Sequence, residues 1–426
     1  MLPKRALLLA CLLHAAASSC GTDEVAAPSG PEAAAFAQAR TGAQGPPPMG
    51  PTILVTPSPS NYVLEFAQPP SGALLQALAN QHGLSLVEQE PGFGGATALF
   101  NGPVGLDLSA VQQTVGPQLT GASVNAPVFL SEGSSLTGGF VVGEWDEEQL
   151  GSGGLETLDL SLVHTVARGA GARVAVLDTG ADLAHPYLAA RLMPVPAGKT
   201  LVSQELLDGV DEDGDGSIDE AHGHGTHVAG IVLQVAPDAM IIPIRVLNAD
   251  GVGSLWDLLS GLELARSMGA TVVNMSISMH GWNDLVETRA LKGRNLGILV
   301  VAAAGNGGFS APTYPGVSPN VAGVAAIDDS GTLASFSGGG SAIRFAAPGV
   351  SITSAYPGGL MASASGTSMS TAVVSGAIAL MKDGLGLPPS EGGTVLCTAS
   401  RAITPSDAVA CGIVSPLDAL IGRLDD

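Results

Sequence analysis

The chain after residue 155 alternates continuous apolar runs with stretches in which apolar residues recur at helical spacing. Continuous apolar runs are typical of strands buried on both faces of a parallel sheet. The runs are Arg173–Leu177, Met240–Leu247, Thr271–Ser276 and Ile298–Ala304, and helical stretches follow at Leu255–Met268 and Asp284–Leu296. This pattern predicts that residues 155–426 form an α/β domain, with an open, mostly parallel sheet and helices on both faces. In such sheets functional side chains collect at the carboxyl ends of the strands.

Residues 52–130 carry shorter elements in a different order. Tyr62–Phe66 alternates like a strand, and Ala73–Gln81 places leucines at helical spacing. Two strands, a short amphipathic helix and a last strand follow at Leu84–Val87, Ala96–Phe100, Leu106–Val115 and Ala122–Leu130. The order β-α-β-β-α-β predicts a small α+β domain of ferredoxin-like topology.

The first residues form a targeting segment. Lys4 and Arg5 precede the apolar stretch Ala6–Ala17, which is too short to span a bilayer and indicates a secretory signal over residues 1–19. The sequence Ala17-Ser18-Ser19-Cys20 resembles a bacterial lipoprotein box, in which Cys20 becomes the lipidated N-terminus. Because Ala17 stands where that box usually has Leu, ordinary cleavage near Ala15-Ala16-Ala17 remains an alternative. Both interpretations place the mature protein outside the cytoplasm.

Two stretches lack apolar periodicity. Residues 20–51 consist mostly of Ala, Gly, Pro, Ser and Gln, which predicts a flexible tether. Residues 131–154 are rich in Gly, Ser and acidic side chains and predict a linker between the two folded parts. The four cysteines are too few for a disulfide scaffold. Outside the cytoplasm Cys397 and Cys411 could pair, or they could remain two buried thiols.

The composition narrows the class of partner. The chain has 16 Lys and Arg against 38 Asp and Glu, a formal net charge of −22, over 426 residues. Binding to nucleic acid or to an anionic membrane face needs clustered Lys and Arg, so this balance argues against such partners. With 46% apolar residues, the chain can bury a large core.

Four polar residues stand in glycine-flanked contexts at the ends of predicted elements. Asp178 ends a buried strand before Thr179-Gly180, and His224 lies in the run His222–Gly230 of mostly small residues. Asn306 follows the last apolar run directly. Ser368, in Gly366-Thr367-Ser368-Met369-Ser370, precedes a long apolar stretch, at a helix N-terminus whose N–H groups favour developing negative charge.

These motifs resemble those of the subtilisin-like serine proteases, the subtilases of peptidase family S8. The order Asp, His, Ser is the subtilisin order of the catalytic triad. The resemblance extends over roughly 158–426 and includes Ala249-Asp250-Gly251, Ala334–Ser337 and Ala347-Pro348-Gly349. It implies a serine endopeptidase with an Asp-His-Ser triad.

The resemblance also implies a role for each residue. Ser368 corresponds to the nucleophile, His224 to the general base, Asp178 to the residue that orients the imidazole, and Asn306 to the oxyanion donor. Substrates of the family pair in extended form with two segments, which correspond here to Gly251, Val252 and Gly253 on one side and to Ser276, Ile277 and Ser278 on the other. Residues 52–130 correspond to a pro-domain that assists folding and inhibits the enzyme until it is cut away, with the cut between Leu130 and Gly154.

Three positions depart from the family pattern. Ala372 stands where Pro usually follows the nucleophile. Ser278 stands where many members have Gly, so its side chain narrows the pocket for the residue before the cut bond. The stretch Ile231–Asp238 is short, and one calcium loop familiar from bacterial subtilisins is missing there.

An acidic loop before His224 has the spacing of the start of an EF-hand. Oxygen ligands fall at positions 1, 3, 5, 7 and 9, and the glycine falls at position 6. The candidate calcium ligands are Asp211, Asp213, Asp215, the Ser217 carbonyl and Asp219. Position 12 is His222 instead of Glu, with Glu220 a possible replacement. A solvated acidic turn is the alternative interpretation.

Other functions remain open beside the protease. Each of the four polar residues, taken alone, has an ordinary structural role as a turn or cap residue. All four having only such roles, in these four sequence contexts, would be rare. Ser368 lacks the Gly-x-Ser-x-Gly elbow of an α/β-hydrolase. The alternatives are a non-catalytic, calcium-stabilised surface module and a processing protease with a single target.

Overall fold

The computed structural model of the chain describes residues 58–131, 140–144, 146, 154–197, 199, 201–212 and 214–422. The chain divides into two compact units, Met1–Gly42 and Ala43–Asp426, and every described residue belongs to the second. The predicted signal segment, Cys20, the tether and Asp213 lie outside the described residues. None of the helices within the described ranges is long and apolar enough to cross a membrane.

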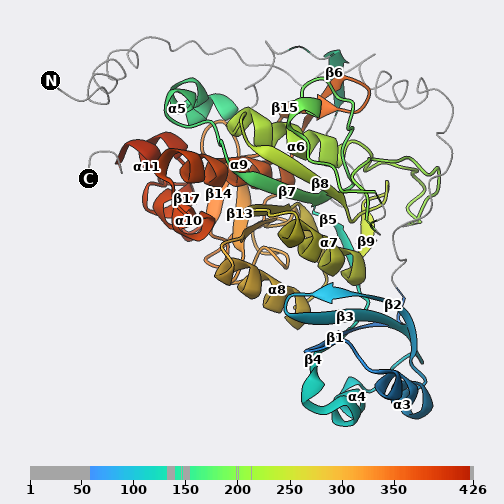
Figure 1. The fold of residues 1–426 in the computed structure, drawn as a ribbon. Coiled ribbons are helices and arrows are strands. Elements are labelled where there is room, and N and C mark those ends of the chain that lie inside the picture. Colours follow the sequence, from blue (N-terminus) through green and yellow to red (C-terminus); the bar gives the residue numbers. More distant parts are fainter. Residues whose placement is uncertain are drawn as a thin grey trace. The chain divides into compact units, whose positions relative to one another are not determined.

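An N-terminal domain contains a four-stranded antiparallel sheet in the order β2-β3-β1-β4 (Figure 1). Its elements follow one another as β-α-β-β-α-β, in agreement with the sequence pattern. They are β1 (Asn61–Phe66), α3 (Gly72–His82), β2 (Ser85–Gly92), β3 (Gly95–Asn101), α4 (Leu108–Val115) with the 3-10 turn η1 (Gly116–Gln118), and β4 (Leu119–Val124). Ser71 and Asp107 cap the two helices through their side-chain oxygens.

The predicted single strand Ala122–Leu130 is wrong, because two strands replace it. β4 ends at Val124, and β5 (Pro127–Leu130) belongs to another sheet. Between them, the Asn125 side-chain oxygen accepts a hydrogen bond from the backbone N–H of Trp256 (2.8 Å). The chain therefore leaves the N-terminal sheet at Asn125 and continues into the larger domain.

The larger domain contains a seven-stranded sheet in the order β17-β14-β13-β12-β10-β7-β8, and every neighbouring pair is parallel. This confirms the predicted α/β class with a mostly parallel sheet. The strands are β7 (Arg173–Asp178), β8 (Met240–Arg245), β10 (Val272–Met275), β12 (Leu299–Ala303), β13 (Ala322–Ile327), β14 (Phe345–Pro348) and β17 (Gly412–Ile413).

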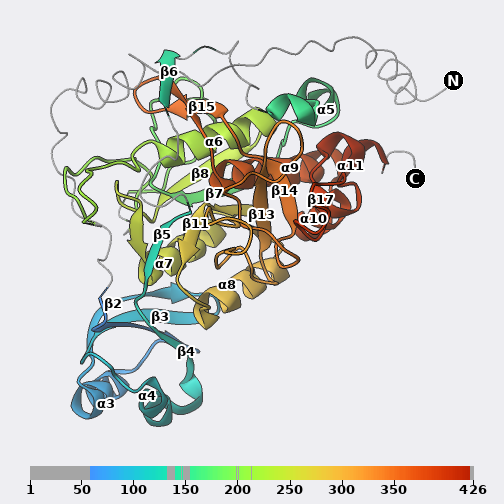
Figure 2. The same cartoon turned by 180° about the vertical axis from the view of Figure 1, so that it is seen from behind.

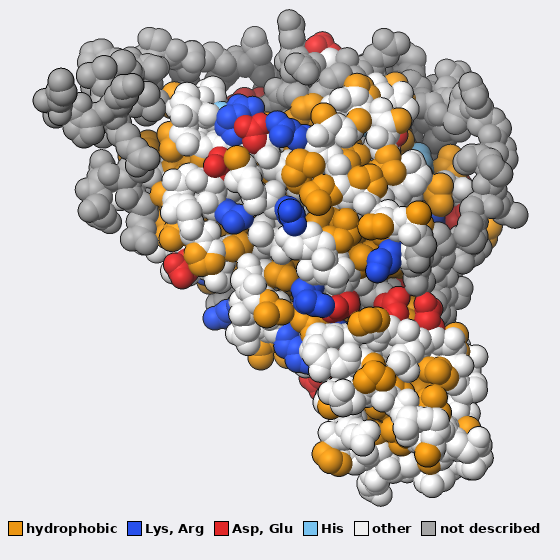
Figure 3. All heavy atoms as spheres, viewed as in Figure 1, with side chains coloured by type: hydrophobic (Ala, Val, Ile, Leu, Met, Phe, Trp, Pro, Cys, Tyr) orange, Lys and Arg blue, Asp and Glu red, His pale blue; other side chains and the backbone are white. Residues whose placement is uncertain are grey.

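Helices cover both faces of this sheet (Figures 1 and 2). α6 (His224–Val235) and α9 (Thr367–Leu385) pack against each other and against one face, while α7 (Leu255–Ser267) and α8 (Asp284–Asn295) pack on the other. The peripheral helices are η3 (Leu155–Leu158), α5 (Leu160–Val166), η4 (Ala189–Arg191), α10 (Pro389–Thr398) and α11 (Pro416–Gly422). On the face drawn in Figure 3, charged side chains are sparse among apolar and uncharged ones.

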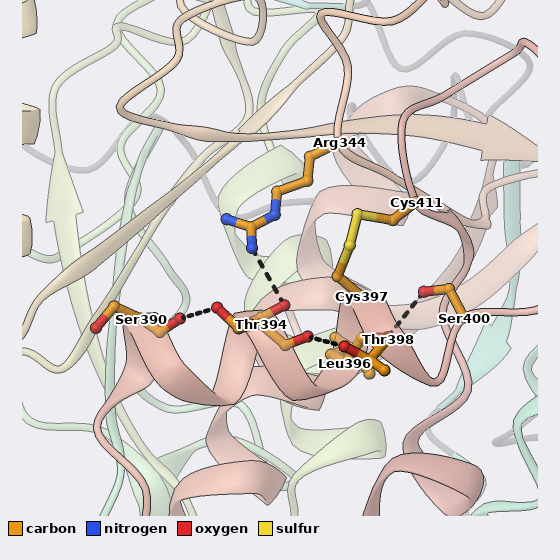
Figure 4. The surroundings of a disulfide bond; sticks show 9 residues. Arg344, Ser390, Thr394, Leu396, Cys397, Thr398, Ser400 and Cys411 are labelled. Carbon is orange, nitrogen blue, oxygen red and sulfur yellow. Dashed lines mark hydrogen bonds between the residues drawn. A yellow bond between two sulfur atoms is a disulfide. The ribbon is translucent and has the colours of Figure 1, made fainter.

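Two three-stranded sheets and one disulfide complete the domain. The first sheet has the order β11-β5-β9, with β9 at Val252–Ser254 and β11 at Ile277–Met279. The second joins β15 (Ile352–Tyr356), β16 (Leu360–Ala364) and β6 (Phe140–Glu144). A disulfide joins Cys397 in α10 to Cys411, just before β17 (Figure 4). The two cysteines are therefore paired instead of being free thiols.

The N-terminal domain contacts α7 and α8 through a buried cation. Arg289 of α8 is 2% exposed, and its guanidinium lies 2.6 Å from Glu65 of β1 and 3.7 Å from Glu263 of α7. It also donates a hydrogen bond to Thr97 of β3 and lies over the ring of Phe93. One buried arginine therefore joins the two domains through charge, hydrogen bonding and a cation–π contact.

Candidate active site

Asp178 and His224 form a fully buried pair at the carboxyl edge of the sheet. Asp178 ends β7 and His224 begins α6, and both are 0% exposed. Asp178 Oδ1 lies 2.7 Å from His224 Nδ1 and accepts a hydrogen bond from Thr179 N at 2.8 Å. Burial raises the pKa of Asp178, and the contact with His224 opposes that shift. The carboxylate therefore fixes the orientation of the imidazole ring.

Glycine permits this close approach of α6 to β7. A Cβ on Gly225 would lie 2.1 Å from the carbonyl oxygen of Gly180, a distance that no side chain tolerates. Gly180 itself has a φ of 107°, a backbone conformation that favours glycine. The glycines of both sequence motifs are therefore needed to bring Asp178 and His224 together.

Glu205 is a site residue that the sequence analysis missed. It is 5% exposed, and its carboxylate accepts hydrogen bonds from the Thr179 hydroxyl (2.5 Å), the Gly223 N–H (2.7 Å) and the Thr226 hydroxyl. It thus joins the turn after Asp178 to the first turn of the helix that carries His224. No motif surrounds Glu205 in the sequence, so only the fold reveals this role.

Ser368 lies in the first turn of α9 and is 0% exposed. Its hydroxyl donates to the carbonyl oxygen of Ser276 at 3.4 Å, directly after β10. Since β10 neighbours β7 in the sheet, Ser368 lies at the same edge as Asp178.

Asn306 follows β12, and its side-chain amide is oriented by Thr367. Asn306 Oδ1 accepts from Thr367 N at 3.1 Å and from Thr367 Oγ1 at 2.9 Å. The Nδ2 atom is buried and makes no hydrogen bond in the described part of the chain. A buried N–H group without a partner is destabilising, so its retention points to a ligand oxygen as its partner.

The neighbouring histidines have other environments. His227 Nε2 contacts the carbonyl oxygens of Ile352 and Ala362, at 3.1 and 3.0 Å. His222 lies edge-on to the ring of Tyr356. Of these three histidines, the structure brings His224 into contact with Asp178.

The two predicted substrate-binding segments enclose the strand β5. This strand pairs antiparallel with β9 and with β11, so it lies between Val252-Gly253 and Ile277-Ser278. Leu130 N donates to Gly251 O at 3.0 Å, and Ser131 N donates to Ser276 O at 3.2 Å. All six predicted substrate-binding residues therefore lie beside an extended segment of the same chain.

The acidic loop winds around its own carboxylates. Asp211 accepts from Gly214 N (2.7 Å) and Gly216 N (3.1 Å), and Asp215 accepts from Ser217 N (2.7 Å). Asp219 accepts from the backbone N–H groups of residues 208 and 209. Within the described residues, which exclude Asp213, no group of three or more His, Cys, Asp or Glu side chains is arranged to hold a metal ion.

The edge of the sheet thus combines a hydroxyl at a helix N-terminus, a carboxylate–imidazole pair, an amide donor and a position for an extended chain. Such a set can perform nucleophilic acyl transfer. A family model described as "Subtilase family" matches residues 169–395.

Curated relatives agree with this match. The chain is 40% identical over 223 residues to the thermostable alkaline protease of Halalkalibacterium halodurans. The aligned region covers 50% of this chain and 57% of that protein. It is 40% identical over 223 residues to subtilisin BL of Lederbergia lenta, covering 50% of this chain and 77% of the relative. It is 37% identical over 226 residues to thermitase of Thermoactinomyces vulgaris, covering 51% of this chain and 76% of that relative.

Proposed function

Because this chain belongs to the subtilase family of serine-type endopeptidases, we propose that it is an exported protease, made as a precursor that cuts itself and then hydrolyses polypeptides. The observation that carries the proposal is the buried contact of Asp178 with His224, at the sheet edge that also carries Ser368 and Asn306.

In the proposed mechanism, the Ser368 oxygen attacks the carbonyl carbon of the bond to be cut, and His224 accepts the hydroxyl proton and passes it to the leaving amine. Asp178 holds the imidazole through Nδ1 and stabilises its charged form. A water molecule then attacks the acyl-enzyme in the same way and releases Ser368.

The oxygen of the reacting carbonyl becomes negatively charged and needs donors. The Asn306 Nδ2 group supplies one, because Thr367 holds the Oδ1 atom on the opposite side of the amide. The N-terminus of α9 adds its helix dipole. Donors held in a buried site need no reorganisation when the charge forms.

The proposed first substrate is the chain itself. Ser276 O accepts hydrogen bonds from both Ser131 N and the Ser368 hydroxyl, so the carbonyl of Ser131 follows directly beside the nucleophile. This supports cleavage between Ser131 and Glu132, at the start of the predicted linker, residues 131–154. After the cut, residues 52–131 would stay bound as an inhibitor, because β5 occupies the position of a substrate strand.

We also propose a structural calcium ion in the acidic loop, held by Asp211, Asp213, Asp215, Ser217 and Asp219. Asp208 and Asp250 lie beside the loop, and partial desolvation together with these two carboxylates raises the pKa of Glu212, within the loop, to about 8. A divalent cation would relieve this repulsion through the lone pairs that the loop carboxylates retain. Chelation with EGTA should therefore lower activity, and full activity in excess EGTA would contradict the calcium proposal.

Export and lipidation rest on the sequence, since residues 1–57 lie outside the described part. The signal segment supports export, and Cys20 is the proposed lipid attachment site. Metabolic labelling with palmitate should mark the wild-type protein and leave Cys20→Ala unlabelled. If both remain unlabelled, simple secretion replaces the lipid anchor.

To test the proposal, the full chain is expressed as wild type and as Ser368→Ala. Intact mass is measured for both proteins, together with covalent labelling by a fluorophosphonate probe. The wild type should shed its N-terminal domain and react with the probe, and Ser368→Ala should stay whole and unlabelled. If both chains fold, stay whole and fail to label, the alternative of a non-catalytic surface module holds.

A further inference from the structure

We infer that Ser278 and Thr313 close the pocket beside the cut bond, so that this site selects substrates with a small residue, such as Ser or Ala, immediately before the bond. This inference rests on the proposed proteolytic function and specifies its substrate class. The observation behind it is that the Ser131 hydroxyl contacts Ser278, which in turn contacts Thr313.

The position of β5 sets the register. Ser131 N and the Ser368 hydroxyl both donate to Ser276 O, so Ser131 is the residue whose carbonyl faces the nucleophile. Leu130 and Phe129 are then the second and third residues before the bond, paired with Ile277 and Ser278. The side chain of Ser131 therefore occupies the pocket that would receive the first residue of any substrate.

Two hydroxyl groups bound that pocket. Ser131 is 7% exposed, and its Oγ accepts a hydrogen bond from Ser278 Oγ at 3.3 Å. Ser278 Oγ in turn lies 2.9 Å from Thr313 Oγ1. The space just beyond a serine-sized side chain is thus filled by the Ser278–Thr313 pair.

Neither side chain can withdraw easily. Thr313 rests on Gly305, where a Cβ would lie 2.6 Å from Thr313 Oγ1 and 2.7 Å from its Cγ2. Thr313 N also donates to Ala304 O at 2.8 Å. On the opposite side, Met279 N donates to Tyr314 O at 2.8 Å, which holds β11 to the segment that carries Thr313.

A larger first side chain would have to displace this wall and break the contact between the two hydroxyls. Well-packed sites resist added volume, and one extra methylene group in a pocket typically changes discrimination by about 10–200-fold. We therefore expect Ser and Ala to be preferred over Leu and Phe by at least about tenfold in kcat/KM.

The test uses the self-processed full chain and 4-nitroanilide peptides of sequence Val-Phe-Leu-X, which copy residues 128–131 with X as Ser, Ala, Leu or Phe. The wild type should prefer Ser and Ala. The Ser278→Gly/Thr313→Ala variant should lose this preference by a rise in kcat/KM for Leu and Phe. Ser310→Gly, an exposed position on the loop before Thr313, is the matched control and should keep the preference.

A second experiment changes the chain's own cut site. Ser131→Phe should slow self-cleavage relative to Ser131→Ala, and adding Ser278→Gly/Thr313→Ala should restore it, which separates pocket size from a folding defect. Hydrolysis of the Phe peptide by the wild type as fast as of the Ser peptide would overturn this inference while leaving the proteolysis intact. Failure to react with the fluorophosphonate or with any peptide would refute the proposed function, and this inference with it.

Discussion

If the chain cuts itself as proposed, removing the guanidinium of Arg289 should make the cleaved N-terminal domain dissociate much faster. In the bound state Arg289 and Glu65 are almost fully buried, at 2% and 4% exposure, and Glu263 is 9% exposed. Burial lowers the pKa of Arg289, and the two carboxylates oppose that shift. In Arg289→Met, Glu65 would lose its hydration on binding without gaining a cation.

The expected magnitude follows from this loss. Truncating one partner of a buried charge pair at an interface costs about 2–5 kcal/mol, and each 1.4 kcal/mol is about tenfold in the dissociation constant. Arg289→Met should lie within that range, because it leaves the buried Glu65 without a cation, whereas Glu263 keeps its ion pair with Arg266. Glu65→Gln should lie lower, since Arg289 keeps Glu263 and Thr97.

The assay follows dissociation of the cleaved N-terminal domain from the self-processed chain. Size-exclusion chromatography separates the two parts, and peptide hydrolysis begins when the N-terminal domain leaves. Interface substitutions act mostly on dissociation rates, so the rate constant for release should rise by about 10²-fold or more. Arg294→Met, an exposed arginine in the last turn of α8, is the control and should release the fragment at the wild-type rate.

The double variant separates charge from packing. Glu65→Gln/Arg289→Met contains no unpaired charge between these two positions, so it should release the fragment more slowly than Arg289→Met alone. An unchanged release rate in Arg289→Met would refute the argument. A double variant as fast as Arg289→Met would assign the effect to lost packing instead.

Four further predictions concern the active site and the stability of the larger domain. Glu205→Gln replaces one acceptor oxygen by an NH₂ group, which faces the three donors of the carboxylate. Steady-state kinetics should therefore show kcat lowered by up to about 10²-fold. An unaffected kcat would show that Glu205 does not position the triad. Asn306→Ala should lower kcat with little change in KM; removal of such a donor in subtilisin costs about 10²–10³-fold, and the same range is expected here. The Cys397–Cys411 bond joins residues 14 apart in the sequence. Its reduction should lower the free energy of unfolding by about 3 kcal/mol, measured by calorimetry with and without reductant. The stability of the Cys397→Ser/Cys411→Ser chain should not change with reductant. In calcium-free buffer the pKa of Glu212 in the folded protein is about 8, against its ordinary 4.5. Because the folded state binds this proton more tightly, the free energy of unfolding should fall as pH rises from 4.5 to about 8. Glu212→Gln should flatten this dependence, and an equally steep slope in that variant would exclude Glu212 as its source.

Much of the larger domain follows from local sequence pattern. Strands buried on both faces need continuous apolar runs, so the predicted run Arg173–Leu177 coincides with β7 to within one residue. The same holds for the helices, since the predicted stretch Asp284–Leu296 coincides with α8 except for its last residue. The candidate catalytic residues stood out because each needs glycine or a small residue beside it at the end of an element.

Other features could not be found in this way. The alternating stretch 122–130 looks like one strand, because alternation reports burial on one face and not the sheet with which each half pairs. Its break depends on the hydrogen bond between Asn125 and Trp256, 131 residues apart. The contact of Thr313 with Ser278 likewise joins two loops 35 residues apart.

The sequence by itself determined the α/β class, the strands β7, β8, β10 and β12, the helices α7 and α8, the candidate residues Asp178, His224, Asn306 and Ser368, and the acidic loop, because these depend on residue type and local spacing. Only the tertiary structure decided which chain segment lies beside Ser368, that Glu205 links the two elements carrying Asp178 and His224, and that Arg289 is buried between two domains. These features are hydrogen bonds and ion pairs between distant segments. Their partners are set by packing and strand register, which no local pattern in the chain encodes.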